Sequence, residues 1–136
     1  MNLMTNELKK ILFIEDEPDI HTIIRYALEK RGGLTVHYCF SGKEALLVAE
    51  SFSPDLILLD VMMPEMDGIA TFQRLQQLPS LASTPIIFMT AKSQVSELAH
   101  YKQLSALDII TKPFNAVLLA DQLRDIWKNY QETQHK

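Results

Sequence analysis

Short apolar runs alternate with helical patterns along this chain of 136 residues. Each run is four or five residues long and stops at a polar residue or a turn. Such runs are typical of strands that are covered on both faces of a sheet. The pattern therefore predicts five strands, at residues 11–14, 34–38, 56–59, 86–89 and 108–111.

After each predicted strand, apolar residues recur three and four positions apart, which predicts an amphipathic helix. Pro18 begins the first helix and Gly32–Gly33 closes it. Proline ends the second and third helices, and Asn115 caps the last. The stripes of the five helices are, in order, Ile20, Ile23, Ile24, Ala27 and Leu28; Ala45, Leu46, Ala49 and Phe52; Ile69, Phe72 and Leu75; a weaker set of Val95, Leu98, Ala99 and Lys102; and Leu119, Leu123, Ile126 and Tyr130.

Five consecutive strand–helix units with short connections predict an α/β fold with a parallel sheet and helices on both faces. Right-handed crossovers then favour a doubly wound, flavodoxin-like arrangement with strand order 2-1-3-4-5. We expect one domain over residues 8–131, with short tails at 1–7 and 132–136. Because the sequence stops just after the fifth helix, we expect no output domain.

Polar residues stand at the carboxyl ends of four predicted strands: Glu15–Asp16, Asp60, Thr90 and Lys112. The carboxyl ends of parallel strands share one edge of a sheet, so we expect these side chains to converge near the switch point between strands one and three. Three carboxylates oppose folding unless a cation joins them. Lys112 is one such cation, and an oxygen-preferring divalent ion such as Mg²⁺ is the other.

Composition and charge exclude several classes of protein. Apolar residues make up 47% and charged residues 22%, with a formal charge of −4, which is ordinary for a globular domain and offers no basic patch for nucleic acid or membranes. No apolar run is long enough to cross a bilayer. The single Cys39 fits a reducing cytoplasm. The four histidines show no metal spacing and are predicted to be surface or helix residues: His21, His37, His100 and His135.

Four motifs in order resemble a response-regulator receiver domain of the single-domain, chemotaxis type. They are Glu15–Asp16, DVMMPEMDG at 60–68, Thr90–Ala91 and TKPF at 111–114, and the likeness spans residues 9–130. The resemblance implies a phosphoacceptor module and not a conventional enzyme. Asp60 would take a phosphoryl group from a phosphohistidine, and Lys112 and Thr90 would bind the phosphoryl oxygens. Pro113 would follow a cis peptide bond.

The resemblance also implies a Mg²⁺ site. Asp16 and Asp60 would bind the ion directly, Glu15 would act through a coordinated water, and the backbone carbonyl of Met62 would complete the protein ligands. Gly68, with Pro64, would shape the intervening loop so that this carbonyl faces the metal.

Two positions depart from the family pattern in ways that concern signal output. Ile109 stands where receivers usually carry a tyrosine or phenylalanine that moves inward on phosphorylation. Ser105–Ala106 replaces a usual Gly-Ala. Apart from these departures, Lys92, two residues beyond Thr90, would sit near the phosphate entrance. An isoleucine cannot perform the aromatic movement, so either the coupling is weak or another element carries it. The alternative is that Ile109 simply packs against the fourth helix.

The implied partners are a sensor histidine kinase or a histidine phosphotransfer protein upstream, and a protein target that contacts the helix 4, strand 5 and helix 5 face. Homodimerisation through that face stays open. A phosphorylation-independent scaffold and a receiver cut from a larger regulator or hybrid kinase are alternatives. A Mg²⁺-dependent phosphohydrolase is disfavoured, because it needs a general acid just after the aspartate where this chain has Met62.

Overall fold

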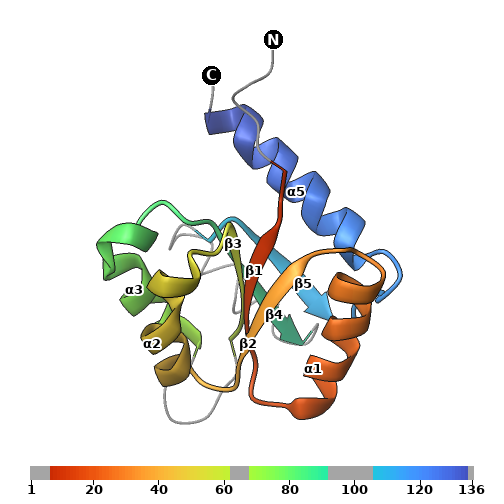
Figure 1. The fold of residues 1–136 in the computed structure, drawn as a ribbon, viewed down its shortest axis with the longest axis horizontal. Helices are drawn as coiled ribbons and strands as arrows, with labels where there is room; N and C mark the ends of the chain where they lie inside the picture. Colours follow the sequence, from red (N-terminus) through yellow and green to blue (C-terminus); the bar gives the residue numbers. More distant parts are fainter. Residues whose placement is uncertain (1–6, 62–67, 92–105, 135–136) are drawn as a thin grey trace.

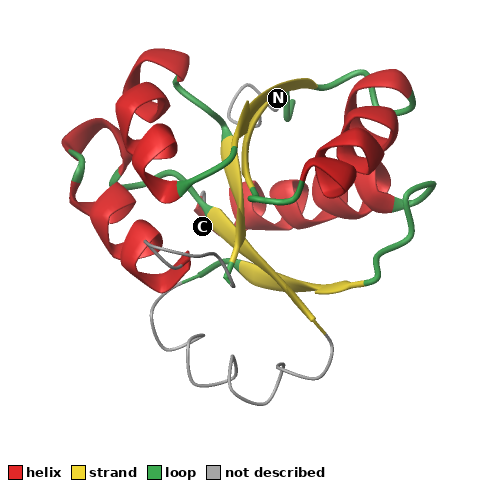
Figure 2. Ribbon diagram, turned by 90° about the horizontal axis from the view of Figure 1, so that it is seen from below, coloured by secondary structure: helices red, strands yellow, loops and turns green. Residues whose placement is uncertain are grey.

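A computed structural model describes residues 7–61, 68–91 and 106–134. Within these ranges five parallel strands form one sheet in the order β2-β1-β3-β4-β5. Helices cover both faces of the sheet (Figures 1 and 2), so the predicted doubly wound α/β arrangement is confirmed. The strands are β1 (Lys10–Ile14), β2 (Thr35–Cys39), β3 (Leu56–Asp60), β4 (Ile86–Ala91) and β5 (Asp108–Lys112).

Four of the predicted helices fall within the described ranges, and the fourth predicted helix, around Val95, lies outside them. The first continues from α-helical into π-helical geometry before Gly33, whose φ of 70° ends it. In the part of the chain described, no helix has the length and apolar character needed to span a membrane. The helical segments are α1 (Pro18–Ile24), η1 (Arg25–Lys30), α2 (Gly42–Phe52), α3 (Gly68–Gln77), η2 (Pro79–Leu81) and α5 (Leu119–Gln134).

The sheet separates two hydrophobic clusters, because successive strand residues point to opposite faces. Ile11 and Phe13 of β1 pack with α1, η1 and α5 on one face, whereas Leu12 and Ile14 pack with α2 and α3 on the other. Cys39 is fully buried in the second cluster. Burial, and then the carboxylate of Glu44, raise the pKa of Cys39 to about 12, so the thiol stays protonated.

Strand register places the functional edge. Ile14 at the end of β1 lies beside Leu59 of β3, so the residues that follow them, Glu15 and Asp60, come to the same edge of the sheet. Lys112 pairs with Ala91 at the same edge. The helices that follow β1 and β3 cover opposite faces of the sheet, which opens the edge between these two strands.

Candidate functional site

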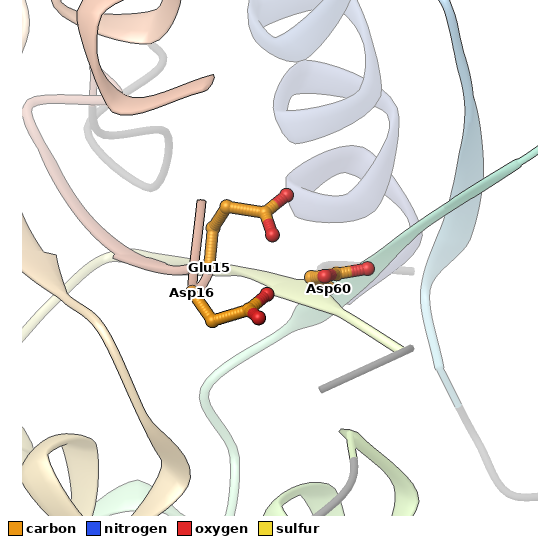
Figure 3. Close-up of side chains that lie close together, drawn as sticks. All are labelled: Glu15, Asp16 and Asp60. Carbon is orange, nitrogen blue, oxygen red and sulfur yellow. The ribbon is translucent and has the colours of Figure 1, made fainter. Parts of the chain in front are cut away.

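Three carboxylates meet at the carboxyl edge of the sheet (Figure 3). Glu15 and Asp16 follow β1 and Asp60 ends β3, and one carboxylate oxygen of each lies within 4.8 Å of the others. Glu15 is 0% and Asp60 is 2% exposed, whereas Asp16 is partly open to solvent. The predicted convergence of these residues is therefore present in the structure.

Lys112 approaches this cluster from the end of β5. Its Nζ donates a hydrogen bond of 2.6 Å to Glu15 Oε1 and lies 3.5 Å from Asp60 Oδ1. The Lys112–Pro113 peptide bond is cis, as the resemblance implies. Among the residues that the structure describes, one ammonium group therefore faces two buried carboxylates, and these described groups together carry an excess of negative charge.

Burial and the neighbouring charges shift the pKa of both Glu15 and Lys112. Burial, followed by the neighbouring Asp60, raises the pKa of Glu15 well above its usual range, although the hydrogen bond from Lys112 opposes the shift. Burial disfavours the charged form of Lys112, but the carboxylates of Glu15 and Asp60 outweigh this effect and raise its pKa. The cluster is thus a site where charges are held close together in a poorly solvated place, which is typical of functional sites.

Two buried polar atoms at this edge have no hydrogen-bond partner within the described ranges. They are Glu15 Oε2 and Thr90 Oγ1. Thr90 lies near the end of β4 and is 1% exposed. Because buried polar groups are almost always hydrogen-bonded, these atoms indicate a site whose ligand completes their bonding.

The donor atoms suit a hard divalent cation. The cluster offers carboxylate oxygens, and Mg²⁺ prefers oxygen ligands while keeping several waters and phosphate oxygens. The predicted backbone ligand, Met62, lies outside the described residues, as do Pro64 and Lys92. Glu15, Asp16 and Asp60 therefore fit a Mg²⁺ ion, which would neutralise the excess charge.

Gly68 lies directly against the backbone at the end of β3, whereas the loop that it was predicted to shape lies outside the described residues. A Cβ atom at position 68 would lie 2.4 Å from Val61 Cα and 2.5 Å from the carbonyl oxygen of Asp60. The Gly68 N–H donates to the Val61 carbonyl at 2.9 Å. Only glycine allows α3 to begin this close to the end of β3.

Ile109 is half-buried on β5 and packs against the cluster on the α2 and α3 face. It lies beside Phe88 of β4 in the sheet register. The fourth helix, against which it was predicted to pack, lies outside the described residues, as does Ser105. Ile109 therefore fills the space on this face as an aliphatic side chain.

The sequence reasoning missed His21. The histidines were predicted to be surface or helix residues. His21 does lie on a helix, α1, but it is buried, whereas the prediction is wrong for His37, which lies half-buried on strand β2. His100 and His135 lie outside the described residues. His21 precedes Ile24 by three residues and Leu28 by seven, so helical spacing already placed it on the core face of α1.

This combination of a five-stranded doubly wound sheet and an acidic edge opposite a lysine defines a class of signalling domain. The family model described as the response regulator receiver domain matches residues 11–124. The chain belongs to this family.

Curated relatives and solved structures agree. The chain is 43% identical over 107 residues to the alkaline phosphatase synthesis transcriptional regulatory protein PhoP of Bacillus subtilis, covering 79% of this chain and 43% of that protein. It is 37% identical over 108 residues to the phosphate regulon transcriptional regulatory protein PhoB of Rhizobium meliloti, covering 79% of this chain and 47% of that protein. The chain thus spans about half the length of the curated relatives it matches.

Two solved structures cover nearly the same span. The chemotaxis protein CheY4 of Vibrio cholerae superposes with a TM-score of 0.79 at 27% identity, covering 88% of this chain and 98% of that one. The signal receiver domain of a signal transduction histidine kinase from Syntrophus aciditrophicus gives a TM-score of 0.77 at 33% identity, covering 89% and 91%.

Proposed function

We propose that this chain is the phosphoacceptor of a two-component phosphorelay and that Asp60 carries the phosphoryl group. The observation that supports this most strongly is the cluster of Glu15, Asp16 and Asp60, in which two carboxylates are buried and which, within the described part of the chain, faces Lys112 and has an excess of negative charge. A divalent cation and a transferred phosphoryl group would together provide partners for the carboxylates and the Thr90 hydroxyl at this edge of the sheet.

In the proposed reaction an oxygen of the Asp60 carboxylate attacks the phosphorus of a phosphohistidine. A P–O bond forms, the P–N bond breaks, and the donor imidazole leaves with the bonding electron pair. The product is an aspartyl phosphate. Asp60 is suited to this role because it is nearly buried, so bulk water has little access to it.

Glu15, Asp16 and Asp60 would hold Mg²⁺, which when bound neutralises phosphoryl oxygens. Lys112 Nζ lies close enough to Asp60 to move from Glu15 onto a phosphoryl oxygen without a change of strand position. The Thr90 hydroxyl, which has no partner in the described part of the chain, would donate to another oxygen. The charge added by phosphorylation, about −1.5 to −2, then changes how these groups pair.

The proposed domain covers residues 8–131, with a fourth helix in the 92–105 segment. Its phosphodonor would be a histidine kinase or a histidine phosphotransfer protein, and its target would contact the helix 4, strand 5 and helix 5 face. Since the matched relatives are about twice as long as the matched region, the same domain also suits a regulator with an output domain.

Ile109 supports a second candidate function, a scaffold that binds partners whether or not it is phosphorylated. The half-buried aliphatic side chain packs against the α2 and α3 face of the sheet, where a movable aromatic ring is usual in the family. Partner affinity with and without beryllofluoride separates the two functions, because equal affinity supports the scaffold and a clear difference supports the switch.

Intact mass spectrometry tests the proposed function. With Mg²⁺ and acetyl phosphate, the protein should gain one phosphoryl group, and Asp60→Asn should gain none. Omitting Mg²⁺ should slow the reaction strongly. An unmodified wild-type protein under these conditions would contradict the proposal.

A further inference from the structure

His21 lies next to the acidic pair but has no part in the reaction described above. It is 3% exposed, and its Nε2 lies 2.5 Å from the backbone carbonyl oxygen of Glu15. Because a carbonyl oxygen can only accept, Nε2 must carry the proton in this hydrogen bond. The other ring nitrogen, Nδ1, is buried and has no partner in the described part of the chain. The polar contact of His21 is thus directed at Glu15.

Aromatic rings on three sides fix the orientation of the imidazole. The ring of Phe40 stacks on it with centroids 4.1 Å apart and an interplanar angle of 5°. The ring of Phe13 meets it edge-on at 5.2 Å and that of Tyr38 lies tilted at 5.4 Å. Phe40 is itself 45% exposed, and this position lets it shield His21 from solvent.

The walls of this cage are themselves held in place. The Tyr38 hydroxyl donates to Glu29 Oε2 at 2.6 Å, and the Arg25 guanidinium lies 4.5 Å from the centre of the Tyr38 ring. Phe13 belongs to strand β1 and is fully buried. His21 therefore presents its Nε2 proton from a side chain with little freedom to turn away.

The hydrogen bond acts on the peptide that joins the two acidic residues. The Glu15 N–H donates to the Cys39 carbonyl at 3.0 Å, which holds this residue to β2. Its carbonyl, bonded to His21, lies in the same peptide plane as the Asp16 nitrogen. Fixing this plane sets the direction from which the Asp16 side chain leaves the backbone.

We propose that His21 is a positioning residue for the divalent cation, because it orients the Glu15–Asp16 peptide so that both carboxylates face Asp60. The inference rests on the proposed function, since it needs a cation at this cluster. Groups that orient metal ligands by hydrogen bonds commonly change metal affinity about 10- to 100-fold when removed. A purely structural role would instead depend on the shape of the ring and not on its N–H.

Calorimetric titration with MgCl₂ of the full chain tests the N–H separately from the ring. H21F keeps a ring in the cage but removes the donor, and it should weaken Mg²⁺ binding roughly 10-fold. H21Q restores an N–H donor at the reach of Nε2 and should recover most of the affinity. H37F makes the same substitution at a histidine that packs against Phe52, away from the cluster, and should bind like the wild type. Urea unfolding in EDTA measures how much each substitution lowers the free energy of unfolding of the metal-free protein.

Equal Mg²⁺ affinity of H21F and the wild type would overturn the inference, and so would a loss that H21Q does not recover. If H21F and H21Q both lose Mg²⁺ affinity in parallel with a loss of unfolding free energy in EDTA, the role of His21 is structural only, and the inference is wrong. If H21F does not fold, H21N takes its place. The asparagine amide reaches only as far as Nδ1 of the histidine, so H21N should bind Mg²⁺ weakly, whereas H21Q should bind it nearly as well as the wild type. A wild-type protein that binds no Mg²⁺ would overturn the proposed function as well, so the two failures are distinguishable.

Discussion

Two aspartates stand at opposite ends of β3 and have opposite surroundings. Asp55 precedes the strand, and its Oδ2 accepts hydrogen bonds of 2.9 Å from the backbone N–H groups of Lys9 and Lys10. Its own N–H donates to the Lys10 carbonyl. Asp60 ends the strand among two other carboxylates, with one lysine nearby. The same residue type on one strand therefore serves to join β1 and β3 at one end and to make a reactive edge at the other.

The difference shows how a functional carboxylate is recognised physically. Backbone amides satisfy a carboxylate without adding charge, so Asp55 stabilises the fold on its own. Carboxylates placed together raise the energy of the folded state until a cation or a proton relieves them. Asp60 thus belongs to an arrangement that costs stability and has a use only when ligands are present.

The largest expected contrast is in phosphorylation. Asp60→Ala should abolish phosphoryl uptake from acetyl phosphate, because the accepting oxygen is gone. Asp55→Ala should still be phosphorylated, since Asp55 lies at the far end of β3. Intact mass spectrometry after equal incubation checks both. If both variants fold and neither is phosphorylated, the claim that only the Asp60 end of β3 is needed for phosphorylation is wrong.

The same two substitutions should change the free energy of unfolding differently. Asp55→Ala removes charge-assisted hydrogen bonds to two backbone amides and should lower the free energy of unfolding by about 2 to 3 kcal/mol. Asp60→Ala in EDTA removes a like charge from the cluster and should leave the free energy unchanged or raise it by on the order of 1 kcal/mol. Urea denaturation measures both. An equal destabilisation by the two substitutions would be contrary to this account.

Gly68→Ala probes the backbone support beneath Asp60. The added methyl group has no room against Val61, so the start of α3 must shift, at a cost of about 1 to 3 kcal/mol. The shift also moves the carbonyl end of β3, and slower phosphorylation should accompany it. Chemical denaturation and a phosphorylation time course measure the two effects. Unchanged values for both would mean that the backbone there yields easily.

Glu15 should make the stability of the metal-free protein depend on pH. Burial and the neighbouring Asp60 raise its pKa in the fold well above that of a free glutamate side chain, so folding takes up a proton when the pH exceeds the pKa of the unfolded state. This contribution is complete below the unfolded pKa and is lost as pH rises through the folded one. The slope for one proton is about 1.4 kcal/mol per pH unit.

Unfolding in EDTA between pH 5 and pH 8 should therefore show falling stability, and Glu15→Gln should flatten the curve. Saturating Mg²⁺ should flatten it in the wild type too, because the cation stabilises the ionised cluster. A wild-type curve that is already flat in EDTA would show that neither burial nor the neighbouring Asp60 raises the pKa of Glu15 in solution.

Local patterns predicted most of the fold. The predicted stripe of the second helix, from Ala45 to Phe52, lies within α2, and α3 ends at Gln77, shortly before the proline that was expected to end it. The π-helical turn at 25–30 has no pattern of its own and was not predicted. Ile23 was assigned to the apolar stripe but is 42% exposed, because the first helix presents its core face through Ile24 and Leu28 instead.

The site was predictable where topology alone decides it. Lys112 and Glu15 are 97 residues apart, yet both end parallel strands, so their meeting follows from the fold class. The bond between His21 and the Glu15 carbonyl was not predictable in this way. It depends on the angle at which α1 leaves β1 and on the three rings that fix the imidazole. Neither can be inferred from the spacing of residues along the sequence.

The most direct test of the central claim locates the phosphoryl group itself. Reduction of the acetyl phosphate-treated protein with borohydride converts an aspartyl phosphate to homoserine, and peptide mass mapping identifies the residue. Homoserine is expected at position 60, together with an intact aspartate at position 55. Homoserine at another position, or none in a protein that has gained a phosphoryl group, would contradict it.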